Sequence, residues 1–69
     1  SRHWNMKRIG RIELTILRIA AYEITQTDTP PKAAIDEALK LTRTFAGDNA
    51  VSFVNGVLDA LAKSQEQAS

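Results

Sequence analysis

The sequence lacks several residue types, and each absence narrows what the chain can do. Its 69 residues contain no cysteine, one histidine and only two prolines and three glycines. Without cysteine there is no disulfide, no thiolate metal site and no cysteine nucleophile. No apolar run approaches the roughly 20 residues of a membrane-spanning helix, and the first residues lack a signal-peptide pattern, so we expect no secretion signal. These absences favour a small cytoplasmic protein that does not enter a membrane.

Catalytic residue patterns are also missing. His3 is the single histidine, and no carboxylate lies at a spacing that fixes it as a partner. The sequence contains neither a glycine-rich phosphate loop nor the strand–turn–helix signature of a nucleophile elbow. We therefore expect a protein that is not an enzyme and that needs no cofactor.

Charge is distributed unevenly although the net charge is only +1. Residues 1–18 contain five basic residues against one acidic residue, Glu13, whereas residues 19–69 contain four basic residues against seven acidic ones. A basic segment of this kind can follow the phosphates of a nucleic acid. A solvated helix flank gives the same pattern, so both interpretations stay open.

Apolar periodicity predicts three helices and no strand. The first spans residues 10–25; its apolar side is formed by Ile9, Ile12, Ile16, Ile19 and Ala20. The second begins at Thr29 as N-cap with Pro30 as first helical residue, and Gly47 closes it in a left-handed conformation. Its apolar side is formed by Ala34, Ala38, Leu41 and Phe45.

The third helix starts at a cap formed by Asp48 or Asn49 and ends near Lys63. Its apolar side is formed by Val51, Val54, Leu58 and Leu61. Residues 1–9 are expected to be the end of a preceding element or a short turn, and residues 64–69 a disordered polar tail. The predicted fold is all-α, a three-helix bundle over residues 10–63.

Asn55 and Gly56 interrupt the apolar pattern of the third helix. Glycine inside a helix costs about 1 kcal/mol relative to alanine. Such a misfit indicates close helix packing at Gly56 or a binding surface, and Phe53 lies beside the apolar stripe rather than at its centre. Two other polar residues, Glu23 and Glu37, also fall on apolar faces. With Asn55 they offer too few ligands for a metal, so we expect them to hydrogen-bond within the bundle and predict no metal site.

Four sequence blocks resemble the carboxy-terminal half of the NusB family of transcription antitermination factors. The blocks are residues 16–24 (Ile-Leu-Arg-Ile-Ala-Ala-Tyr-Glu-Ile), 30–32, 35–38 and 53–59 (Phe-Val-Asn-Gly-Val-Leu-Asp). The last block is the most specific, and their order agrees from about Trp4 to Leu61. The family's first half, with its arginine-rich opening segment, has no counterpart here. The resemblance therefore implies an all-α, non-catalytic NusB-like C-terminal subdomain.

The resemblance also implies partners and site residues. Members of the family bind boxA-type RNA together with ribosomal protein S10, within the RNA polymerase antitermination complex. Phe53 matches an aromatic residue that stacks a base, although a core position is its alternative. Asn49, where the family has Asp, would favour RNA or serve only as an N-cap, and Lys32 retains a phosphate-contacting lysine. Ser52 replaces a basic residue, and Glu13 matches the contact with ribosomal protein S10 or is an exposed helical glutamate.

Two other functions remain alternatives. NusB-like domains accompany ribosomal RNA cytosine methyltransferases, and the polar segment 64–69 leads us to expect a natural terminus rather than a following catalytic domain. The chain could instead be a protein-interaction module without RNA binding. Because the first half has no counterpart, we also expect a homo-oligomer through the face that half would cover, formed by the first and third helices.

Overall fold

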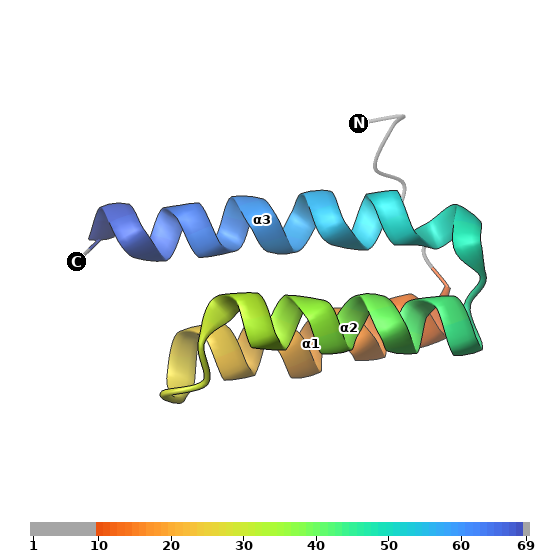
Figure 1. Cartoon of the computed structure of the whole chain (residues 1–69), viewed down its shortest axis with the longest axis horizontal. Helices are drawn as coiled ribbons and strands as arrows, with labels where there is room; N and C mark the ends of the chain where they lie inside the picture. Colours follow the sequence, from red (N-terminus) through yellow and green to blue (C-terminus); the bar gives the residue numbers. More distant parts are fainter. Residues whose placement is uncertain (1–9, 69) are drawn as a thin grey trace.

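The computed structural model describes residues 10–68, which form three α-helices (Figure 1). Helix α1 spans Arg11–Gln26 and α2 spans Pro31–Phe45; a 3₁₀ turn, η3 (Asp48–Ala50), leads into α3 (Val51–Ala68). Consecutive helices run in opposite directions, and α3 lies along the pair formed by α1 and α2. The predicted all-α, three-helix fold is confirmed. The expectation for residues 1–9, which include His3, lies outside the described residues.

Proline places the start of α2 one residue later than the sequence predicted. Thr29 is not the N-cap: Pro30 occupies that position with φ −59° and ψ 134°, and Pro31 is the first helical residue. The residue before a proline is pushed away from helical backbone angles, so Pro31 holds Pro30 extended. Thr29 instead donates its backbone N–H to the hydroxyl of Thr27 at 3.1 Å. The rule that places proline at the first helical position holds, but it applies to the second proline of the pair.

A glycine with positive φ connects α2 to the next turn. Gly47 has φ 100° and ψ 162°, and its N–H and that of Ala46 both donate to the carbonyl of Thr42, at 2.9 and 2.8 Å. The predicted positive φ at Gly47 is confirmed, although its ψ is extended rather than helical. The predicted cap at Asp48 or Asn49 is wrong, because both residues lie inside η3, whose N-cap is Gly47 without a side-chain hydrogen bond. The 3₁₀ turn starts the helical backbone before α3 begins.

Helix α3 extends beyond its predicted end. It continues through Ala68 instead of stopping near Lys63, and residues 64–68, expected to be a disordered tail, are helical and exposed. Gln65, Glu66 and Ala68 are good helix formers, and no glycine or proline follows Gly56 to end the helix. No helix within residues 10–68 has the length and apolar content required to span a bilayer.

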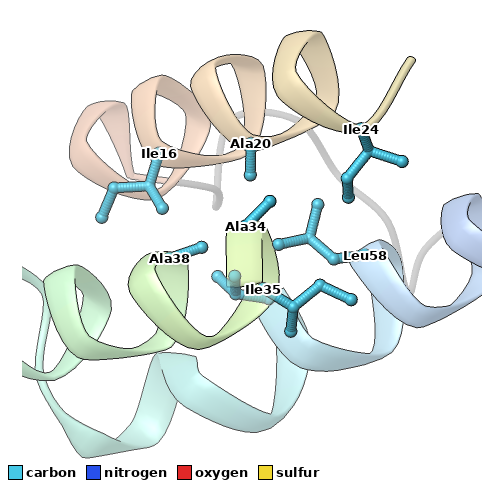
Figure 2. Close-up of a cluster of buried hydrophobic side chains, with 8 residues drawn as sticks. Ile16, Ala20, Ile24, Ala34, Ile35, Ala38 and Leu58 are labelled. Carbon is cyan, nitrogen blue, oxygen red and sulfur yellow. The ribbon is translucent and has the colours of Figure 1, made fainter. Parts of the chain in front are cut away.

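The core lies where the three helices meet, and it combines isoleucines and alanines of α1 and α2 with two residues of α3 (Figure 2). Its buried apolar members are Ile16, Ala20, Ile24, Ala34, Ile35, Ala38, Val54 and Leu58. Thr42 is the buried polar residue of this region, and its hydroxyl donates to the carbonyl of Ala38 at 2.7 Å. The predicted apolar faces thus supply the core, but Ile12, Ile19 and Phe45, which were predicted on the same faces, are exposed.

Candidate nucleic-acid interface

Three of the predicted RNA-binding residues lie together at one end of the bundle. At this end α1 begins, α2 ends and α3 starts (Figure 1). Asn49 lies in η3 and Ser52 in the first turn of α3, and both side chains are exposed. Phe53 follows directly and is half-buried. The positive end of the α3 dipole points toward the same region, which favours a nearby phosphate.

Phe53 has two environments at once. It packs against the hydrophobic core, and it also lines a groove of about 470 Å³ on the outer face of α3. The other groove residues are Ser52, Gly56, Val57 and Ala60. The ring is therefore not wholly enclosed by aliphatic side chains, and it is anchored on the core. An anchored aromatic ring that borders an open groove is a suitable platform for a base.

Gly56 does not serve close helix packing. Gly56 is exposed. A Cβ atom added to it would meet no heavy atom within 4 Å, apart from its chain neighbours and the backbone of its own helix. The expectation of close packing at Gly56 is wrong, because this side of α3 faces away from both other helices. Gly56 lines the groove beside Phe53.

Replacing Gly56 with alanine should raise the free energy of unfolding by about 1 kcal/mol, because alanine favours the helix and the methyl group meets open space. Urea unfolding followed by circular dichroism measures this. The matched control is Gly47→Ala, which should lose stability because φ is positive there. A destabilised Gly56→Ala variant would show that the backbone at this position has a contact that its exposure does not suggest.

Lys32 lies far from the other three residues. It is in the first turn of α2, and a helix of 15 residues is about 22 Å long, so nearly that distance separates it from η3. Its Nζ atom pairs with Oδ2 of Asp36 at 3.4 Å, and both side chains are exposed. Lys32 lines a different groove, of about 420 Å³, together with Asn55 and Asp59. The structure therefore does not bring Lys32 and Phe53 together.

Glu13 is half-buried in the first turn of α1. Its carboxylate lies over Gly10, the N-cap residue, in space that a side chain at position 10 would need. A carboxylate at the third helical position stabilises the positive end of the helix dipole. Glu13 thus has a structural role at the helix start, at the end of the bundle that also carries Asn49.

The three polar residues of the apolar faces do not converge. Glu23 and Glu37 line one shallow hollow between α1 and α2, whereas Asn55 lines the groove between α2 and α3. Within residues 10–68 no cluster of three or more His, Cys, Asp or Glu side chains is arranged to hold a metal ion.

Two cations lie at the candidate interface: Arg11 belongs to the basic segment that the sequence indicated, whereas Arg43 was missed. Arg11 is in the first turn of α1 and Arg43 in the last turn of α2, so the antiparallel order of the helices places both at the end that carries Asn49. Both side chains are exposed. The predicted order of three antiparallel helices already implies that the start of the first helix and the end of the second lie at the same end of the bundle. The sequence analysis compared charge between segments of the sequence and not between the ends of the bundle.

Comparison with known proteins identifies relatives over nearly the whole chain. The sequence model of the NusB family matches residues 1–63. The transcription antitermination protein NusB of Desulfovibrio desulfuricans is 55% identical over 67 residues, which cover 96% of this chain and 41% of the relative. The NusB protein of Nitratidesulfovibrio vulgaris is also 55% identical, with 44% of it covered. That of Clostridium acetobutylicum is 46% identical over 68 residues, with 50% covered.

The chain thus spans half or less of the length of these relatives. No solved structure matched the chain significantly.

Proposed function

The chain belongs to the NusB family, and from this premise we propose that it is the RNA-binding, C-terminal portion of a transcription antitermination factor. It would act without catalysis, in the bacterial cytoplasm, on boxA-type RNA together with ribosomal protein S10 and the RNA polymerase antitermination complex. The observation that carries the proposal is the position of Phe53. Its ring is anchored on the core, borders an open groove and lies beside exposed Asn49 and Ser52.

Single-stranded RNA is recognised mainly by stacking its bases on aromatic rings and by hydrogen bonds to base edges and phosphates. Phe53 supplies the ring. Asn49 and Ser52 supply neutral polar groups that can donate to a phosphate without repelling it. Arg11 and Arg43 add positive charge at the same end, which attracts the RNA over a Debye length of about 10 Å at 0.1 M salt.

Lys32 and Glu13 have separate places in the proposal. Lys32 contacts phosphate only if the RNA strand continues along α2 to its first turn, because about 22 Å of helix separates it from η3. It must also give up its exposed ion pair with Asp36, which is worth at most about 1 kcal/mol. Glu13 lies at the start of α1 and is proposed to face ribosomal protein S10.

The 69 residues should bind RNA weakly when they are the only protein present. They represent half or less of the relatives' length, and a large share of RNA affinity comes from the number of cation–phosphate contacts. We expect binding that weakens steeply as salt is raised. Nanomolar, salt-insensitive binding by this chain would contradict the proposal.

Replacing Phe53 with alanine should weaken the binding of labelled boxA RNA about tenfold, because one stacked base is lost. Fluorescence anisotropy at low salt measures the affinity. The matched control is Tyr22→Ala, which removes an exposed aromatic ring from α1 outside the interface and should leave the affinity unchanged. Circular dichroism must show that both variants keep their helices. Equal affinities of Phe53→Ala and the parent chain would favour a protein-interaction module instead.

A further inference from the structure

Helix α3 carries an Asn-Gly pair, Asn55-Gly56, in its interior. Asn-Gly is typical of turns, and asparagine is among the chemically labile residues because its side chain can cyclise onto the next backbone nitrogen. We propose that Asn55 is a site of spontaneous deamidation, with water as the reactant, and that the docking of α3 on the core sets the rate. The proposal rests on groups of α3 and does not depend on RNA binding.

The reaction exchanges the side-chain amide of Asn55 for a carboxylate. The backbone nitrogen of Gly56 loses its proton to a solvent base and attacks Cγ of Asn55. A C–N bond forms and closes a five-membered succinimide, while the Cγ–Nδ2 bond breaks and releases ammonia. One water molecule then opens the ring. Attack at Cγ leaves aspartate at position 55, and attack at the backbone carbonyl carbon leaves isoaspartate, so the sum is asparagine plus water to acid plus ammonia.

The side chains around the pair do not prevent this reaction. Asn55 is half-buried and lines the groove between α2 and α3, and within residues 10–68 no hydrogen bond or ion pair holds its amide. Gly56 has no side chain, and the space around its Cα is open apart from its chain neighbours and the backbone of its own helix. Neither a partner of the amide nor a bulky neighbour keeps the two reacting atoms apart.

The helical backbone does prevent the reaction. In an α-helix each N–H donates to the carbonyl four residues earlier, so the N–H of Gly56 is directed at the carbonyl of Ser52 and not at the side chain of Asn55. Ring closure requires the ψ angle of Asn55 to leave the helical range, which breaks this hydrogen bond. The reaction therefore requires α3 to unwind at position 55.

Unwinding at position 55 requires α3 to leave the core. Val54 and Leu58 lie on either side of the pair, and both are 0% exposed. Fraying of the helix from Ala68 does not reach Asn55 while Leu58 is docked, so the opening is close to global unfolding. Because refolding is much faster than ring closure, the rate follows the open fraction, which is below about one molecule in a hundred even for a small domain.

The products weaken the helix that protects the site. Aspartate at position 55 lies one turn before Asp59 in the same groove, so two like charges repel each other. Isoaspartate adds a carbon atom to the main chain and disrupts the helix between Phe53 and Leu58. Modified molecules should therefore open more readily, and since the change is irreversible, its extent records how long α3 has been undocked.

Peptide mapping by mass spectrometry, with digestion at acid pH, measures deamidation during incubation at mildly alkaline pH. The folded chain should react at Asn55 at least about a hundredfold more slowly than the chain in concentrated urea. Asn49, which precedes an alanine, is the reference in the same chain and should react more slowly than Asn55 in urea. Gly56→Ala should slow the reaction in urea, because a side chain hinders ring closure. Equal rates at Asn55 with and without urea overturn the proposal, as does a rate in urea no faster than that of Asn49.

Leu58→Ala tests whether docking on the core sets the rate. It keeps the Asn-Gly pair but destabilises the fold, so in buffer Asn55 should react at least about thirtyfold faster than in the parent chain. If the variant is largely unfolded, its rates in buffer and in urea should be equal, which also supports the proposal. The matched control Asp59→Ala should stay within about threefold of the parent. A rate for Leu58→Ala equal to that of the parent overturns the role of the core.

Discussion

Replacing Leu58 with alanine should lower the free energy of unfolding by about 2–5 kcal/mol, the range for removing a buried leucine side chain. Leu58 is 0% exposed, and Figure 2 shows it reaching from α3 toward Ile24 of α1 and Ala34 of α2. At about 0.05–0.15 kcal/mol per residue, a chain of 69 residues has a total stability of only about 3–10 kcal/mol. The substitution should therefore remove a large share of that stability, and at the upper end of the range it leaves the chain largely unfolded.

Urea unfolding followed by helical circular dichroism measures the loss. The matched control is Asp59→Ala, at the next position of α3, where the side chain is exposed and the change should stay within about 0.5 kcal/mol. If Leu58→Ala and Asp59→Ala unfold at the same urea concentration, α3 does not depend on Leu58 for docking on the other two helices.

Periodicity predicted the residues at the centre of each buried face, but it also included Ile12, Ile19 and Phe45, which are exposed. The three- and four-residue spacing identified Ile16, Ala34, Ala38, Val54 and Leu58, and all five are in the core. This succeeds because a helix can bury only one stripe, so the spacing of apolar residues fixes the stripe. Helix ends are set by local backbone effects that the spacing does not contain. The N-cap of α2 was misplaced because two adjacent prolines compete for the first helical position.

The candidate interface was predicted less completely than the core. The spacing placed Phe53 beside the apolar stripe, which agrees with its half-buried position, whereas its role as a base-stacking ring came only from the family resemblance. Lys32 was grouped with Phe53 although a helix length separates them. The spacing in a sequence indicates on which face of a helix a residue lies. The end of the bundle at which the residue lies follows only from the order and direction of the helices. The order and direction of the helices would also have identified Arg43, in the last turn of α2, as a cation of the candidate interface.

The contact between α1 and α2 depends on small side chains, so we expect Ala38→Leu to be strongly destabilising. Ala38 is 3% exposed and lies one helical turn after Ala34 on α2. Figure 2 shows Ala20 of α1 directed toward Ala34. The hollow beside these alanines is about 50 Å³, less than the volume of two water molecules in the liquid, whereas leucine adds three carbon atoms. The larger side chain must push α1 and α2 apart or adopt a strained rotamer, at a cost of about 1–3 kcal/mol or more.

The same substitution at Ala33 separates overpacking from any general effect of leucine. Ala33 is on the exposed side of α2, and leucine is nearly as good a helix former as alanine, so Ala33→Leu should change the free energy of unfolding by less than about 0.5 kcal/mol. Overpacking that separates the helices should also weaken the contact of α1 and α2 with α3, because Ile16, Ala38 and Leu58 belong to one core. We therefore expect Ala38→Leu to unfold at lower urea concentration in a single transition. An Ala38→Leu variant as stable as Ala33→Leu would mean that the two helices are not held at the close distance that Ala20, Ala34 and Ala38 permit.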